Sequence, residues 1–304
     1  MLRGAAALAV TCSLALSASP ALAAAPCETE PQQRVLVEGR GTLESVIVDR
    51  RGRIYFTDAG RGELLSMANR HAEPRVLIEG IRAPGGLALL PDGSLLVGFG
   101  DAIATGVTGF LSPQAGLIRY QPKTGAHEIF AEGLTMANGV ARGPDGATYA
   151  SNDVGLGIDR VLGGTVARGW ATVLSSNGLT IDSSGRYLYA AQTFQPAAIA
   201  RIEIADPATV ETFFQAPLAD IAAGPDGLTR DEHDNLYVAA NSGGQVWRIT
   251  ADGSSYCSLA SFAPLGPSDV AFGRGKRRFA RQHLYVTTFQ GELIQLKDVR
   301  APRR

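Results

Sequence analysis

Short apolar stretches and polar turns alternate along this chain in a pattern that repeats six times. Each repeat begins with an apolar strand, turns at Asp and Gly residues, and continues in a second strand that ends in Tyr and small residues. Strands of this length between turn residues are typical of β-hairpins, and self-similarity at a fixed spacing is typical of repeat architectures. The repeats cover residues 43–58, 84–101, 137–153, 176–193, 225–241 and 267–289.

Further strands follow the hairpins and complete a four-stranded unit. Third strands are expected at 62–67, 116–122, 198–204, 244–250 and 291–298, with outer strands at 73–80 and 126–133; the third repeat is the least regular. Equivalent positions are separated by 41, 53, 39, 49 and 42 residues, which suits a four-stranded propeller blade. The pattern therefore predicts an all-β chain folded as a six-bladed β-propeller.

The N-terminal part of the chain supplies the expected ring closure. Residues 31–39 closely match residues 72–80, the outer strand of the first repeat, whereas the last repeat ends near residue 298 without an outer strand of its own. We expect residues 33–39 to complete the last blade, because a closed ring leaves only short, protected strand edges.

One position recurs on the first strand of every repeat. In the first four repeats it lies eight residues before the turn glycine, and in the fifth repeat eight residues before Asp234, which takes the place of that glycine. The sixth repeat carries an insertion in its turn, so it is aligned on its apolar run instead. The occupants of this axial position are Glu44, Gly85, Asn138, Asn177, Asp226 and Ser268.

Inner strands surround the central channel of a propeller, so side chains at this axial position point to the same height on the axis. Four of them carry hard oxygen donors, which suit Ca²⁺ and leave Mg²⁺, Mn²⁺ and Zn²⁺ as other candidates. Gly85 and Ser268 are too short to reach inward and leave room for water or substrate. The competing interpretation is that Asn-Gly and Asp-Gly pairs are ordinary turn chemistry. Four donors at one position favour a metal site formed by Glu44, Asn138, Asn177 and Asp226.

The loops after the second strands are expected on the same face as these donors. The longest, residues 99–116, is interpreted either as a cover for the mouth or as a mobile loop without a catalytic role. Four phenylalanines would make this mouth apolar, and two asparagines begin neighbouring loops. The expected mouth residues are Phe99, Phe110, Asn152, Phe194, Asn241 and Phe289.

Composition changes this picture mainly at the N-terminus. Arg3, an apolar Ala-rich run and the small-x-small sequence Ala21-Leu22-Ala23 predict a secretory signal peptide over residues 1–25, so a periplasmic or secreted location and a single domain over 26–304 are expected. Cys27 and Cys257 remain, either as a disulfide or as two free thiols. The net charge of −1 gives no reason to expect nucleic acid or a membrane surface as a partner.

The chain resembles the regucalcin/gluconolactonase family of six-bladed propellers, which is related to diisopropylfluorophosphatases and paraoxonases. The resemblance covers about residues 40–298 and rests on Glu44, Asn138-Gly139, Ser176-Asn177-Gly178-Leu179 and Pro225-Asp226-Gly227-Leu228. It implies that Glu44, Asn138, Asn177 and Asp226 are ligands of a catalytic divalent ion. Sugar-lactonase members have an arginine where this chain has Met136. This difference adds Met136 to the expected mouth and favours a less polar ester or lactone.

We therefore expect an exported, monomeric, calcium-dependent hydrolase of small lactones or related esters. Calcium would polarise the carbonyl, and Asp226 would act as base or nucleophile. Two alternatives stay open: a phosphotriesterase or arylesterase with the same ion, and a non-catalytic ligand-binding propeller with structural calcium. A strictosidine-synthase-like condensing enzyme is a more distant one. None of the four histidines occupies the axial position, and the basic insertion 273–278 is expected to be a solvated loop.

Overall fold

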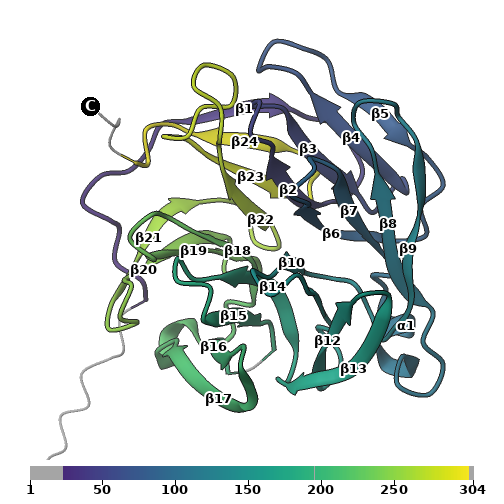
Figure 1. Cartoon of the computed structure of the whole chain (residues 1–304). Coiled ribbons are helices and arrows are strands. Elements are labelled where there is room, and N and C mark those ends of the chain that lie inside the picture. Colours follow the sequence, from purple (N-terminus) through teal and green to yellow (C-terminus); the bar gives the residue numbers. More distant parts are fainter. Residues whose placement is uncertain (1–22, 195, 301–304) are drawn as a thin grey trace, which may run out of the picture.

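Six four-stranded antiparallel sheets form a closed ring in the computed structural model, which describes residues 23–194 and 196–300. Figure 1 shows the first strand of each sheet nearest the centre of the ring and the fourth strand at its rim. This arrangement confirms the predicted all-β six-bladed propeller. Within the described residues, no helix has the length and apolar character needed to cross a bilayer.

Each blade consists of four strands that are consecutive in sequence, except at the closure. Blade one contains β2 (Leu43–Val48), β3 (Ile54–Asp58), β4 (Glu63–Met67) and β5 (Arg75–Ile78). Blade two contains β6 (Pro84–Leu89), β7 (Leu95–Phe99), β8 (Ala115–Tyr120) and β9 (His127–Leu134). Blade three contains β10 (Val140–Arg142), β11 (Thr148–Ser151), β12 (Gly157–Leu162) and β13 (Thr165–Thr172).

The second half of the ring follows the same order. Blade four contains β14 (Ser176–Ile181), β15 (Tyr187–Gln192), β16 (Ala198–Glu203) and β17 (Asp206–Gln215). Blade five contains β18 (Pro225–Arg230), β19 (Leu236–Ala240), β20 (Gln245–Ile249) and β21 (Tyr256–Ser261). Blade six contains β22 (Pro267–Phe272), β23 (Leu284–Thr288), β24 (Leu293–Leu296) and β1 (Gln33–Val37). The two short helices are α1 (Ile103–Thr108) and the 3₁₀ helix η1 (Leu218–Asp220).

The N-terminal strand closes the ring as predicted. β1 pairs antiparallel with β24, with Gln33 opposite Leu296 and Val35 opposite Ile294. In Figure 1 the purple β1 lies beside the yellow β24, so the two ends of the propeller sequence share one sheet. Segments about 260 residues apart in sequence must therefore meet before the last blade is complete.

The hydrophobic core is divided into wedges between neighbouring blades. Each of the six apolar clusters draws its buried side chains from two adjacent sheets, and one of them joins blade six to blade one. Trp247, for example, is fully buried between blades four and five. Every blade therefore depends on both neighbours for burial of its faces, which stabilises the ring as a whole.

Left-handed turns between the first and second strands explain the repeated glycine of the sequence pattern. Gly52, Gly93, Gly146 and Gly185 all have positive φ values, a conformation that glycine adopts without steric cost. The fifth turn has Asp234 there, with φ of 62°. Its carboxylate accepts hydrogen bonds from the backbone N–H and the hydroxyl of Ser183, so contacts with blade four support the less favourable conformation.

A disulfide joins Cys27 to Cys257 across 230 residues of sequence. Beside it, the Cys27 N–H donates to the Ser258 carbonyl (2.9 Å) and the Ser258 N–H donates to the Ala25 carbonyl (2.8 Å). The segment before β1 thus pairs along the outer edge of β21. Of the two alternatives left by the sequence, the structure has the disulfide.

We expect Cys27→Ser to lower the free energy of unfolding by about 2–5 kcal/mol, because the disulfide closes a long loop in the unfolded chain. Denaturant unfolding of the oxidised protein measures this loss. Cys257→Ser and the double variant should lose the same amount as Cys27→Ser. If the loss of unfolding free energy in the double variant equalled the sum of the two single losses, the two cysteines would stabilise the protein independently and not through a shared disulfide.

Candidate metal centre

The side chains of the axial position meet around one central cavity. Glu44 lies on β2, Asn177 on β14 and Asp226 on β18, and Asn138 lies two residues before β10. All four line a cavity of about 740 Å³ that follows the axis of the ring. Ser268 lines it as well, but its hydroxyl donates to the Leu43 carbonyl (2.7 Å) and so faces blade one.

A local irregularity of the first strands aims these side chains inward. The pairing register shifts by one residue across the axial position in five blades, for example between Leu43 and Val46 and between Pro225 and Leu228. Such a bulge turns one side chain out of the alternating pattern. The N–H group after Glu44, that of Ser45, donates to Thr57 Oγ1 at 3.0 Å, and the N–H after Asn138 donates to Ser151 Oγ at 2.7 Å.

The glycines that follow the axial residues are explained by close contact between blades. A Cβ on Gly139 would lie 2.4 Å from the Asn177 carbonyl oxygen, and one on Gly178 would lie 2.5 Å from the Asp226 carbonyl oxygen. Neither glycine is among the described residues with positive φ. Asn177-Gly178 therefore lies within β14 and Asn138-Gly139 just before β10, both at a crowded axis, which argues against the alternative that these glycines serve left-handed turns.

Burial and mutual repulsion raise the pKa values of the two axial carboxyls. Asn138, Asn177 and Asp226 are 7%, 5% and 5% exposed, whereas Glu44 is partly accessible from the cavity. Burial is the main cause of the raised pKa of Glu44, followed by the charges of Asp101 and Asp226. Burial also raises the pKa of Asp226 most, with Asp153 and Asp269 adding to it.

Two acidic residues of this site, Asp101 and Asp153, were missed by sequence reasoning. Asp101 follows β7 and Asp153 follows β11, so both lie in loops that the sequence placed at the mouth. Burial and the charge of Asp153 raise the pKa of Asp101 to about 7. Burial raises the pKa of Asp153 to about 6. The available signal was an acid two residues after the second strand in blades two and three.

The blade-six neighbour of the axial position is also acidic. Asp269 Oδ2 accepts hydrogen bonds from the Ser45 hydroxyl (2.8 Å) and the Val46 N–H (2.9 Å), which links blade six to blade one. Burial raises the pKa of Asp269 to about 6. Within the part of the chain that the structure describes, no arginine or lysine is among the main causes of these five pKa shifts.

This donor set fits a hard divalent cation. It combines two axial carboxylates and two amides, the ligand chemistry that Ca²⁺ prefers. Asp153 Oδ1 is buried without a hydrogen-bond partner, as expected of an oxygen left for a cation or water. Among residues 23–194 and 196–300, no three Asp, Glu, His or Cys side chains are arranged to hold an ion by themselves. A site here would therefore need the two amides.

The longest of the loops after the second strands contains α1 and packs on blade three. A Cβ on Gly106 of this helix would lie 2.4 Å from Val154 Cγ2 and 2.7 Å from Met136 Sδ. The Asn152 amide donates to the Gly106 carbonyl at 3.0 Å. Met136 is 2% exposed beneath the helix. Met136 and Asn152 therefore hold the loop on blade three, and its role as a cover for the mouth stays a prediction.

The other expected mouth residues occupy different environments. Phe99 is 8% exposed and packs in the core between blades one and two, and Asn241 donates to the Pro267 carbonyl (3.0 Å). Phe110 and Phe194 are exposed, at 49% and 56%, and Phe289 is partly exposed. The structure thus brings Phe110, Phe194 and Phe289 to the surface of this face, whereas Phe99 and Asn241 support the packing beneath it.

We expect Gly109→Ala to detach the α1 cover. Gly109 has an ordinary helical φ of −58°, but a Cβ there would lie 2.2 Å from the backbone oxygen of Thr135. Because backbone cannot move aside cheaply, the loop must shift. Limited proteolysis within residues 99–116 should become at least about tenfold faster, since cleavage follows the open population. Ala104→Val, on the exposed side of the same helix, is the matched control and should cleave like the parent protein.

Fold and site together define a six-bladed propeller whose axis is lined by carboxylate and amide oxygens. Residues 158–290 match the family model described as the SMP-30/Gluconolactonase/LRE-like region. This match confirms, over that part of the chain, the resemblance stated from the sequence motifs. No curated protein matches the chain in sequence.

Solved structures of this fold include several activities. A gluconolactonase from Xanthomonas campestris superimposes with a TM-score of 0.69 at 17% identity over 92% of this chain and 99% of the other. A calcium-binding regucalcin from Agrobacterium tumefaciens gives 0.68 at 19% identity over 90% and 95%. Virginiamycin B lyase from Staphylococcus aureus gives 0.58 at 16% identity over 88% and 99%. At these identities the likeness concerns the fold, and function must be argued from the site.

Proposed function

We propose that this protein is an exported, calcium-dependent hydrolase of lactones or related esters. The observation that carries the proposal is the axial set of Glu44, Asn138, Asn177 and Asp226 around one cavity, with further buried acids and no described cation opposing them. The family-model match and the gluconolactonase-like structural relatives support the same reaction class.

The axial residues would hold the cation through their carboxylate and amide oxygens. Bound there, the ion supplies Lewis-acid polarisation of a substrate carbonyl. Asp226 is the candidate for base or nucleophile because one of its carboxylate oxygens could bind the ion while the other faces the attacking water. Asp226 would then take a proton from water or attack the carbonyl directly. Glu44 and the amides of Asn138 and Asn177 hold the centre in place.

The cover favours substrates less polar than a sugar lactone. Phe110 is exposed at the end of the covering loop and offers an apolar contact, whereas Met136 is buried under α1 and would act only by shaping that loop. We expect small alkyl lactones and aryl esters to be hydrolysed with higher kcat/KM than gluconolactone, because apolar side chains at the mouth stabilise a bound apolar substrate more than a polar one.

A hydrolysis screen with and without Ca²⁺ tests the proposal. The panel contains alkyl lactones, gluconolactone, aryl esters and phosphotriesters, assayed after chelation and again after calcium is restored. Calcium-dependent turnover confined to phosphotriesters or aryl esters would favour that alternative. Calcium binding without turnover of any substrate would favour a non-catalytic ligand-binding propeller.

Export is supported by the disulfide and by the position of Ala24. A disulfide between Cys27 and Cys257 suits an oxidising compartment, and Ala24 N lies 2.7 Å from Asp220 Oδ2. Cleavage after Ala23, two residues before the end of the 1–25 segment expected from the sequence, would leave the charged α-amino group of Ala24 beside that carboxylate. Intact mass of the exported protein tests this point: a chain that retains residues 1–23 would contradict it. Residues 1–22 of the expected signal lie outside the described residues.

A further inference from the structure

The far end of the central cavity is rimmed by arginines. The cavity that begins at the axial donors also contacts Arg142, Arg230, Arg274 and Arg300, at the ends of the first strands and beyond β24. An adjoining cavity of about 420 Å³ is lined by four arginines and one glutamate, together with Gly273 and Gln282. Its charged residues are Arg50, Arg274, Arg281, Arg300 and Glu232.

The basic insertion of blade six is anchored in the fold, which fixes two of these arginines. Phe279 is 3% exposed and packs edge-on against Tyr285, with ring centroids 5.2 Å apart. The Gly275 N–H donates to the Phe279 carbonyl (3.2 Å), and the Arg281 N–H donates to the Gly275 carbonyl (3.2 Å). The charged side chains of the insertion, residues 273–278, are exposed, whereas its backbone is anchored. Arg274 within it and Arg281 just after it border the cavity.

Blade one holds the insertion from the other side. A Cβ on Gly52 would lie 2.3 Å from the Arg278 carbonyl oxygen and 2.9 Å from Gly275 Cα. The backbones of the two turns are therefore in direct contact. Arg50, two residues before Gly52, is brought to the same cavity as Arg274 by this contact.

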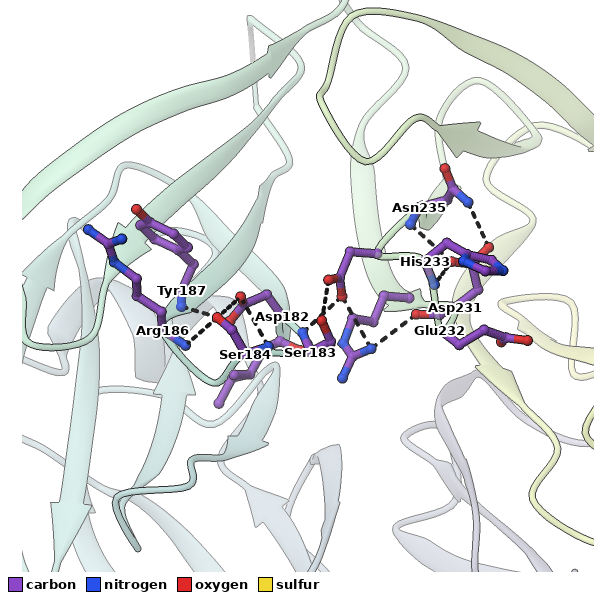
Figure 2. A network of polar contacts seen from close by, with 12 residues as sticks. Asp182, Ser183, Ser184, Arg186, Tyr187, Asp231, Glu232, His233 and Asn235 are labelled. Atoms are coloured by element: carbon purple, nitrogen blue, oxygen red, sulfur yellow. Dashed lines mark hydrogen bonds and ion pairs between the residues drawn. The ribbon is translucent and has the colours of Figure 1, made fainter.

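The acids near this rim are already engaged. Figure 2 shows Asp231 inside its own turn, where it accepts hydrogen bonds from the His233 and Asn235 N–H groups. Asp234 binds Ser183 of blade four and lies 3.2 Å from Arg230. Glu232 stands outside this network in Figure 2, and its carboxylate pairs with Arg300 at 3.1 Å.

Positive charge therefore exceeds negative charge at the rim. The guanidinium of Arg300 lies 3.3 Å above the Phe272 ring, and its Nε is buried without a partner. The side chain of Arg274 is solvent-accessible, and its pKa is lowered by partial burial and by the charges of Arg50 and Arg230, against a smaller opposing effect of Asp49. Among the described residues, the side chains of Arg50, Arg274 and Arg281 have no hydrogen bond or ion pair. A bound anion would reduce the electrostatic repulsion among these guanidinium groups.

We propose that this arginine rim, formed by Arg50, Arg274, Arg281 and Arg300, is a binding site for a small multivalent oxyanion of the phosphate type. Arginine forks match the oxygens of phosphate groups bidentately, and several guanidinium groups around one cavity favour more than one negative charge. The site lies at the opposite end of the cavity from the mouth loops and does not depend on the proposed hydrolase activity.

Calorimetric titration with inorganic pyrophosphate at constant ionic strength tests the site. We expect saturable binding that the double substitution Arg274→Gln and Arg281→Gln weakens at least about tenfold. The matched control is Arg277→Gln with Arg278→Gln, which removes the same charge from the same insertion outside both cavities and should change affinity less than about twofold. Absence of saturable binding to the parent protein, or equal losses in both variants, would overturn the proposal.

Two further measurements separate the remaining outcomes. Vesicles of phosphatidylglycerol, compared with phosphatidylcholine, distinguish a lipid headgroup from a free anion. Vesicle binding without pyrophosphate binding would overturn the free-anion site.

Thermal unfolding without anion checks that the double variant is folded. Since Arg274→Gln with Arg281→Gln relieves repulsion, its Tm should equal or exceed that of the parent, and pyrophosphate should raise the Tm of the parent but not of the variant.

Discussion

Asp226→Asn is expected to lower kcat for the best lactone or ester by at least about 100-fold, because the substitution removes the group proposed as base or nucleophile. The fold should persist. Asn keeps an oxygen at the axial position, and it replaces a buried carboxyl whose pKa is already raised by burial and by neighbouring acids. Circular dichroism and thermal unfolding check the fold, and steady-state kinetics check the activity.

A comparison with Glu44→Gln separates reaction chemistry from cation binding. Glu44 is proposed as a ligand only, so the activity of Glu44→Gln should fall at low calcium and recover as calcium is raised to saturation. Activity of Asp226→Asn should stay low at every calcium concentration. Glu79→Gln, exposed on the first blade, serves as the neutral control. Recovery of Asp226→Asn at high calcium would assign Asp226 to binding alone, and near-parental activity would remove it from the site.

Repetition explains why so much of the fold was predictable. A residue that recurs at the same distance from a turn occupies the same height in every blade, so Glu44, Asn177 and Asp226 were placed relative to one another without any contact information. Ring closure by β1 was predictable for the same reason, since its sequence matches the outer strand of blade one.

The loops could not be predicted in this way because they do not repeat. Asp101 and Asp153 follow second strands, but the equivalent residues in other blades differ, and their burial depends on how the long loop 99–116 packs on blade three. The glycines after the axial residues were ambiguous for another reason. Glycine serves both left-handed turns and close backbone contact, and only the structure shows that Gly139 and Gly178 belong to the second kind.

Calcium removal is expected to make stability strongly dependent on pH. Asp101, Asp153 and Asp269 have folded-state pKa values of about 7, 6 and 6, all above the value of about 4 expected in the unfolded chain. Carboxyls with raised pKa values favour the folded state while they are protonated. Their contribution is complete below pH 4 and is lost as the pH rises through 6 and 7.

The calcium-free protein should therefore unfold at a lower temperature at pH 8 than at pH 5. Asp92 and Asp252 act in the opposite direction, since hydrogen bonds lower their pKa values to about 2, but their effect is confined to pH below about 4. Comparison of pH 5 with pH 8 thus excludes Asp92 and Asp252. His283, whose pKa is lowered mainly by burial, favours the folded state at pH 8 and opposes the trend of the buried acids. Thermal unfolding in a chelator measures the change.

Restoring calcium should reverse the trend, because the cation neutralises the same carboxylates. At a concentration 100 times its Kd, calcium adds about 2.7 kcal/mol, or roughly 5–10 °C in Tm for a chain of this size. This gain should be present at pH 8 and small at pH 5, where protons compete for the oxygens. Asp101→Asn with Asp153→Asn should flatten the pH slope of the calcium-free protein. An equal calcium gain at both pH values, or an unchanged slope in this variant, would show that the buried acids and the cation do not share one centre.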